Sequence, residues 1–323
     1  MVGLSKVGRV MGKSEMPGVP ASTDDEKQVA AMDIVLSALT SSQRAVFRQL
    51  ADKLSGYVSA EYIFCFSLHQ YEARCTGCFE SKTDKEWLKA GILLVYSDNE
   101  ERDAQRIQHL ANNVDLGGHQ YAAAVLSYED AMERLAAGDP FVCRVFRYGA
   151  LLYSLGDALP KRTGFVCYET LLKKTREGWY RWFNNSCQFM DCAGYCLMER
   201  KYNMAVFMMH QGVEQACKAM LKVMLYVSPN THNLAWMLKL CGTLAPEISS
   251  VFPRDSPQEQ ALFNRLKKSY MDSRYAVDFS VSEEEAWTLY YRASSLLRIA
   301  GKLCNTRIDE MERLVGVSKG VIN

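Results

Sequence analysis

The sequence predicts an α+β protein in which a small α/β domain is followed by an all-α, up-and-down helical bundle. Strand-like and helix-like segments alternate through the first half of the 323-residue chain, which is typical of an α/β domain. After Leu159-Pro160 the strand signals stop, and the later segments have helical periodicity. The length of the chain also exceeds the usual size of one domain.

Shifts in composition set the expected domain boundaries. Residues 1–25 hold Gly, Ser, Pro and scattered Lys without the apolar core of a signal peptide, so we expect a disordered leader and a cytoplasmic protein. The α/β domain is expected over residues 26–159, the bundle over 160–310 and a tail over 311–323. No run of about 18 apolar residues occurs, so we expect no membrane span.

The elements of the first half follow from the spacing of apolar residues. A run of apolar residues at steps of three and four predicts a helix over residues 26–55, with a break near 40–42. Further helices are expected over 100–112 and 128–137, and strands over 60–68, 91–96, 119–126 and 150–153. Residues 141–146 fit either a helix or a loop. The strand over 91–96 is apolar on both faces, which is typical of a central strand.

The spacing of apolar residues in the second half predicts a bundle of five helices. Their expected ranges are 168–200, 202–227, 232–244, 257–278 and 282–305, with a weaker helical signal beyond residue 305.

A polar stripe crosses the second of these helices. Gln211, Glu214, Lys218 and Lys222 step by 3, 4 and 4, so they line up along one side. Two interpretations are open: a solvated face with internal salt links, or polar groups placed where the helix meets its neighbours.

Four short blocks in the second half carry a family resemblance. They are FMMHQGVEQ at residues 207–215, THNL at 231–234, FPRD at 252–255 and SYMDSRY at 269–275. In this order they resemble the "HQ…E" helix, the "THNL" turn and the "YxxxRY" segment of the HEPN family (higher eukaryotes and prokaryotes nucleotide-binding), with FPRD fitting one bacterial branch. The resemblance implies a helical bundle that binds a nucleotide or RNA, and a homodimer.

Many members of this family are metal-independent ribonucleases that use an Arg followed four to six residues later by a His. The matching Arg here would be Arg274, but the following residues, 275–280, contain no His, and none occurs after His232. We therefore expect no catalytic residue. His232 could act as the general base only if the fold brings it next to Arg274.

The resemblance and the helical spacing together give the candidate binding residues. Phe263, Lys267, Tyr270 and Arg274 share a face by steps of 4, 3 and 4, and cations beside an aromatic ring suit a phosphate and a base. The candidate ligand-binding residues are Gln211, Glu214, His232, Asn233, Lys267, Tyr270 and Arg274.

A structural role is the alternative for each of these residues. Arg274 could pair with Glu214 or Asp278, with Tyr270 in the core, and Gln211 and Glu214 could form a buried network that fixes helix register. Thr231 is expected to cap the helix that follows it.

The first half resembles a minimal nucleotidyltransferase domain in the order of its elements. That family needs a Gly-Ser pair and two carboxylates one residue apart to hold Mg²⁺. Here Ser67 has no Gly before it, and no Asp-x-Asp occurs between residues 62 and 126. Asp98, Glu100 and Glu101 are expected at a helix start, where they favour the macrodipole. We expect no transferase activity, and a degenerate scaffold for dimerisation or partner binding is an equal interpretation.

The 11 Cys residues favour free thiols in a reducing compartment, because their number is odd and no export signal precedes them. Cys75 and Cys78 form a single CxxC pair, too few ligands for zinc, and we expect a turn with incidental thiols. Cys192 and Cys196 are expected to face the core. We expect neither a metal nor a cofactor.

The net charge of +1 excludes a strong general attraction to nucleic acid. Three hypotheses remain. The first is a non-catalytic nucleotide- or RNA-binding protein acting as a homodimer. The second is a ribonuclease with a rearranged site, using Arg274 and His232. The third is an antitoxin-like scaffold that binds a protein partner.

Overall fold

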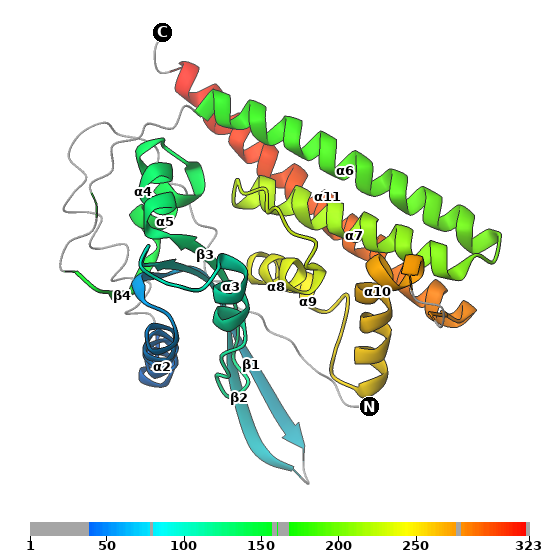
Figure 1. Cartoon of the computed structure of the whole chain (residues 1–323), viewed down its shortest axis with the longest axis horizontal. Helices are drawn as coiled ribbons and strands as arrows, with labels where there is room; N and C mark the ends of the chain where they lie inside the picture. Colours follow the sequence, from blue (N-terminus) through cyan, green and yellow to red (C-terminus); the bar gives the residue numbers. More distant parts are fainter. Residues whose placement is uncertain (1–38, 78–79, 157–159, 161–167, 276–278, 321–323) are drawn as a thin grey trace. The chain divides into compact units, whose positions relative to one another are not determined.

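The chain forms two compact units in the computed structural model, divided between Phe165 and Val166. The structure describes residues 39–77, 80–156, 160, 168–275 and 279–320. The first unit holds a mixed sheet with helices, and the second is entirely helical (Figure 1). This confirms the predicted α+β class. The expected leader, 1–25, lies outside the described residues.

The first unit is built on a four-stranded sheet. Its elements are α2 (Ser41–Tyr57), β1 (Ala60–Gly77), β2 (Glu80–Tyr96), α3 (Ala104–Asn112), β3 (Gln120–Ser127), α4 (Tyr128–Ala136), α5 (Pro140–Tyr148) and β4 (Ala150–Ser154). The strand order is β3-β2-β1-β4. β1 is antiparallel to both β2 and β4, whereas β2 and β3 are parallel because α3 crosses between them.

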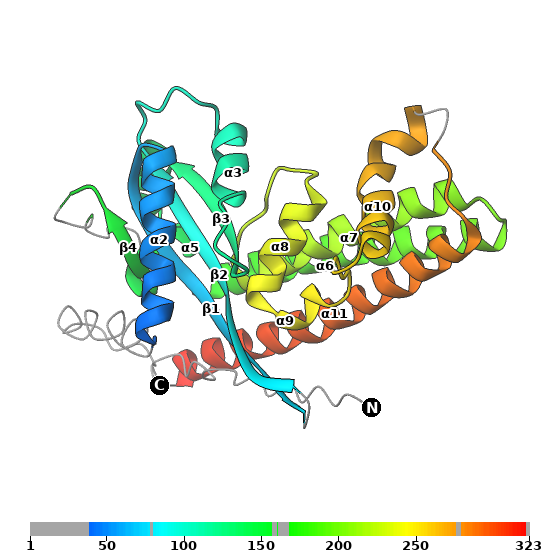
Figure 2. The same cartoon turned by 90° about the horizontal axis from the view of Figure 1, so that it is seen from below.

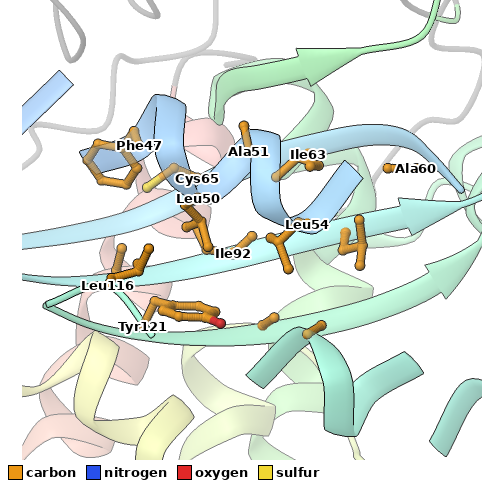
Figure 3. Packing of buried hydrophobic residues seen from close by; sticks show 14 of the residues in the cluster. Phe47, Leu50, Ala51, Leu54, Ala60, Ile63, Cys65, Ile92, Leu116 and Tyr121 are labelled. Carbon is orange, nitrogen blue, oxygen red and sulfur yellow. The ribbon is translucent and has the colours of Figure 1, made fainter. Parts of the chain in front are cut away.

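Both faces of this sheet are covered by helices. On one face, α2 contributes Phe47, Leu50 and Leu54 to a buried cluster that also contains Ile63 and Ile92 (Figure 3). On the other face, aromatic residues of β1 meet α5: the Phe64 and Phe146 ring centroids lie 4.7 Å apart, and those of Phe66 and Phe141 lie 5.3 Å apart. Successive strand residues point to opposite faces, so a strand covered on both sides is apolar throughout, as predicted for 91–96.

The hairpin of β1 and β2 is longer than the sequence predicts. Pairing continues past the expected strand ends, through Tyr71 opposite Trp87, to Gly77 opposite Glu80. The predicted turn at the CxxC pair is therefore wrong for Cys75, which lies in β1, while Cys78 lies outside the described residues. The apolar alternation that marks a half-buried strand is missing from this part of the hairpin.

The carboxylates that follow β2 have different partners from those expected. The helix starts at Ala104 rather than residue 100, and Asp103 caps it by accepting from the Arg106 N–H. Glu100 instead accepts from the Ser59 N–H and pairs with Arg102 at 2.7 Å. Asp98 accepts from the Glu129 N–H at the start of α4. Of the three carboxylates expected at a helix start, Asp98 therefore contacts one as predicted, but that helix is α4 rather than α3.

Two other uncertain starts are resolved by caps. Thr40 forms a capping box with Gln43, so the expected break near 40–42 is the start of α2. Asp139 caps α5, whose first residue is Pro140, so the segment 141–146 is helical rather than a loop.

The second unit contains all five expected helices. They are α6 (Tyr168–Met198), α7 (Tyr202–Met224), α8 (Leu234–Leu244), α10 (Pro257–Tyr275) and α11 (Glu283–Gly320), with the four-residue α9 (Pro246–Ser249) in addition. The long helices α6, α7 and α11 pack along one another, and α8 and α10 pack against α7 (Figures 1 and 2). Because α11 continues to Gly320, most of the expected tail is helix.

Gly212 lets α6 and α7 pack closely. A Cβ at this position would lie 3.1 Å from Met190 Cγ, and the Ser186 hydroxyl donates to the Gly212 carbonyl at 2.7 Å. Since α7 also contacts α8, α10 and α11, it is the central helix of the bundle.

The expected burial of the α6 cysteines is half right. Cys196 is buried, but Cys192, one turn earlier on the same helix, is exposed. Across the described residues, no helix combines the length and apolar character that crossing a membrane would need.

Candidate functional site

Three residues spaced by four on α7 bring polar groups into the bundle. His210, Glu214 and Lys218 share one side of the helix because a step of four is close to one turn. All three are buried, and Glu214 is only 1% exposed. Of the two interpretations of the polar stripe, the solvated face is therefore wrong at Glu214 and Lys218, which are both buried.

Glu214 is the centre of the polar contacts. The Lys218 ammonium donates to Oε1 at 2.8 Å, and His232 Nδ1 lies 3.1 Å from each carboxylate oxygen. His210 Nε2 is 3.7 Å from Oε2, an ion-pair distance too long for a direct hydrogen bond. Burial alone would raise the pKa of this carboxyl, but the contacts with His210, Lys218 and His232 outweigh burial and lower it to about 2. Glu214 is therefore ionised at neutral pH.

The turn after α7 presents His232 to Glu214. Asn233 caps α8, because its side chain accepts from the Trp236 N–H, and Thr231 Oγ1 accepts from the Asn233 N–H. The prediction that Thr231 is the N-cap is wrong, since its hydroxyl stabilises the turn one step earlier. The helix begins at Leu234, which leaves His232 in the turn with 56% of its side chain exposed.

Tyr270 on α10 stacks against both histidines. Its ring centroid lies 5.0 Å from that of His232, with an interplanar angle of 14°, and 5.5 Å from that of His210. His210 also reaches α10 through Nδ1, which lies 3.0 Å from the Leu266 carbonyl oxygen. We refer to His210, Glu214, Lys218, His232 and Tyr270 as the Glu214 cluster.

An aromatic residue from α6 borders the cluster. The Lys218 ammonium lies 5.6 Å from the centroid of the Trp182 ring, and the Arg181 guanidinium lies 5.0 Å from the same ring. Cations over an indole face are attracted by its quadrupole. The Glu214 cluster and Trp182 thus combine side chains from α6, α7, α10 and the turn before α8.

Two amides on α7 lie beside this cluster. Gln211 Nε2 and Gln215 Oε1 are buried, and neither has a hydrogen-bond partner in the part of the chain that the structure describes. A buried amide group without a partner costs free energy, which a ligand that supplies the missing bond would recover.

The structure brings together some of the predicted site residues. Glu214, His232 and Tyr270 are in contact, Asn233 holds the turn, and Gln211 lies on α7 near them. The other two candidates are on α10. Lys267, three residues before Tyr270, is exposed, and Arg274, four residues after it, lies on the helix, but its side chain is outside the described residues.

The predicted shared face of α10 is not uniform. Phe263 is buried against Phe252, and the Arg254 guanidinium lies 4.0 Å from its ring centroid, whereas Lys267 faces solvent. A spacing of four residues drifts around a helix, so residues four apart can differ in burial.

Sequence reasoning missed the roles of His210 and Trp182 and did not include Lys218 among the candidates. His210 and Lys218 each lie four residues from Glu214 in the sequence, and this spacing was a signal that both could contact it. Trp182 lies on another helix, and nothing in the sequence pairs it with Lys218.

The first unit offers no metal site within the residues that are described. No group of three or more His, Cys, Asp or Glu side chains there converges on a point where a metal ion could sit, and the same holds for the described bundle. Ser67 Oγ is buried without a hydrogen-bond partner among the described residues.

A family model matches part of the second unit. The family model described as "HEPN domain" matches residues 179–303. These residues are a HEPN domain. The matched range holds Glu214, His232 and Tyr270, so the Glu214 cluster belongs to the HEPN domain.

Two solved structures are similar to the chain. An archaeal HEPN homologue has 17% identity and a TM-score of 0.28, covering 39% of this chain and 97% of that chain. A nucleotidyltransferase-like protein from Exiguobacterium sibiricum has 10% identity and a TM-score of 0.28, covering 84% of this chain and 79% of that chain. No curated protein matches the sequence.

Proposed function

We propose that the HEPN domain binds a nucleotide or a short stretch of RNA at the Glu214 cluster and does not cleave it. One observation carries the proposal: His232 is held by a buried carboxylate and stacked on Tyr270, while more than half of its side chain is exposed. A side chain that is fixed in place and open to solvent is pre-organised for a ligand.

The groups around His232 suit a nucleotide. Bases stack on aromatic and imidazole rings, and the buried Gln211 amide supplies a hydrogen-bond donor. Lys218 is already paired with Glu214, so the phosphates need other cations. We propose Lys267 and Arg274 for this role, because they lie one turn before and one turn after Tyr270 on α10.

Glu214 and Asn233 have indirect roles in this proposal. Glu214 fixes the His232 ring, and Asn233 fixes the turn that carries it. We also propose that the protein acts as a homodimer, which sedimentation equilibrium would test by giving twice the chain mass of 36.6 kDa.

Ribonuclease activity is the second candidate function, and the pairing of His232 with Glu214 favours it. A carboxylate that orients an imidazole is the arrangement by which many enzymes prepare a general base. The HEPN motif of an Arg followed by a His is absent after Arg274, so cleavage would depend on His232.

A thermal-shift screen against nucleotides and short RNAs, followed by gel analysis of the RNAs, tests both functions. We expect a rise in melting temperature with intact RNA, and loss of the rise in His232→Ala. His109→Ala is the matched control, because His109 is an exposed histidine on α3, in the other unit. RNA cleavage that is lost in His232→Ala would replace the binding proposal with the nuclease. The absence of both a shift and cleavage would refute both functions.

A further inference from the structure

The contacts of His232 fix which of its ring nitrogens carries hydrogen. Both oxygens of an ionised carboxylate accept, and Glu214 is ionised, so Nδ1 of His232 must be the donor across the 3.1 Å contacts. The other nitrogen, Nε2, lies on the opposite edge of the ring. Within the described residues Nε2 has no hydrogen-bond partner, and the side chain is 56% exposed.

The charge of Glu214 is already balanced without His232. The Lys218 ammonium lies 2.8 Å from Oε1 in a site where its side chain is only 11% exposed. His210 Nε2 approaches the other oxygen at 3.7 Å. A further positive charge on His232 would add a cation to a cluster that already holds Lys218, whereas a neutral imidazole completes the hydrogen bonds. In the neutral ring with hydrogen on Nδ1, Nε2 has a lone pair and accepts.

We propose that His232 Nε2 accepts a hydrogen bond from an uncharged donor on the nucleotide, and that Glu214 is the positioning residue that presents this nitrogen. The inference rests on the proposed function, since it names the part of the nucleotide that His232 contacts. An adenosine nucleotide has two kinds of such donor: a ribose hydroxyl and the exocyclic amino group of the base. A phosphate offers acceptors only, so it does not suit Nε2 in this state.

Titration calorimetry of the full chain with nucleotide analogues tests the inference. The parent is ATP, compared with its 2′-deoxy and 3′-deoxy forms and with purine riboside triphosphate, which lacks only the amino group. We expect one analogue to bind about five- to tenfold more weakly than the parent, the usual effect of losing one neutral hydrogen bond. Weaker binding of a deoxy analogue would identify the ribose, and weaker binding of purine riboside triphosphate would identify the base.

The same titrations with His232→Ala assign the effect to His232. In that variant the weakened analogue and the parent should bind equally, whereas His109→Ala should keep the difference. Equal binding of the parent and all analogues to the wild-type protein would overturn the inference and leave the proposed function standing. If tripolyphosphate binds as tightly as the parent, and His232→Ala weakens that binding, the inference is likewise overturned and the proposed function stands. Absence of binding by all nucleotides would overturn the proposed function and the inference together.

A second measurement does not need a ligand. In ¹⁵N–¹H NMR spectra of the five His side chains, the signal that disappears in His232→Ala belongs to this residue. The neutral ring should carry its hydrogen on Nδ1. A neutral ring with hydrogen on Nε2 would overturn the inference, since Nε2 would then be a donor.

Discussion

Glu214 illustrates how one buried charge organises a site. Its carboxylate lies inside a bundle where an unpaired charge would be costly, and three basic groups from two segments of the chain surround it. A buried ion pair of this kind often adds little net stability compared with apolar packing. Its effect here is positional, because the same carboxylate anchors His232.

Removing that charge should destabilise the HEPN domain. Glu214→Gln leaves the Lys218 ammonium in a nearly buried position without its carboxylate, and breaking a buried pair costs roughly 3–5 kcal/mol. Urea unfolding at pH 7 would measure the loss. Glu247→Gln, on α9, is the control, because this carboxylate is exposed and its removal should change stability by less than about 0.5 kcal/mol.

The effect of Glu214→Gln should depend on pH. The folded protein lowers the pKa of Glu214 from 4.5 to about 2, so the unfolded chain takes up the proton first as the pH falls. The stability that comes from ionised Glu214 is fully present above pH 4.5 and is lost towards pH 2. The difference between wild type and Glu214→Gln should therefore shrink in unfolding experiments from pH 6 to pH 3. A constant difference would mean that the pKa of Glu214 is not lowered.

At the scale of one element, the start of α8 controls where His232 lies. Asn233→Ala removes the cap on the Trp236 N–H and should cost about 1 kcal/mol of stability. Because the cap also fixes the turn, nucleotide affinity should fall even where the domain stays folded. Unfolding and calorimetry on one preparation measure both effects. Lost stability with unchanged affinity would mean that Asn233 is only a cap.

A second element, β2, has a position where only glycine fits. A Cβ on Gly91 would lie 2.4 Å from Phe66 Cε2 and 2.4 Å from Ser67 Oγ. Gly91→Ala should therefore destabilise the first unit by about 1–3 kcal/mol through overpacking. Gly56→Ala on α2 is the matched control, because nothing lies within 4 Å of its Cβ and alanine favours a helix. A neutral Gly91→Ala would show that Phe66 and Ser67 can move aside.

The sequence predicted elements best where packing leaves a periodic trace. The five bundle helices and the central strand were found because their apolar residues repeat with the period of a helix or cover both faces. The far part of the β1–β2 hairpin was missed because backbone pairing, rather than a buried face, defines it. The four residues of α9 are too few to show a period.

The candidate site was predictable in part for the same reason. Motif resemblance identified Glu214, His232 and Tyr270, which meet in space although 56 residues separate the first from the last. The direction of each side chain depends on tertiary packing, which spacing alone does not give. This is why the sequence did not separate buried Phe263 from exposed Lys267, or assign Trp182 to Lys218.

At the scale of the whole molecule, the two units each have their own buried core. A fragment of residues 160–323 should therefore fold alone and bind nucleotide with the affinity of the full chain, because the Glu214 cluster draws all its residues from the HEPN domain. Circular dichroism and calorimetry would check this. A folded fragment that binds no nucleotide, beside a full chain that does, would assign the ligand to the first unit.

Photo-crosslinking tests the central claim, a nucleotide bound at the Glu214 cluster, most directly. The full chain is irradiated with 8-azido-ATP, digested, and the labelled peptides are identified by mass spectrometry. We predict label on the turn that carries His232 or on the α10 peptide that carries Tyr270, competed away by ATP and reduced in His232→Ala. Label confined to residues 39–156, in the first unit, would contradict the account.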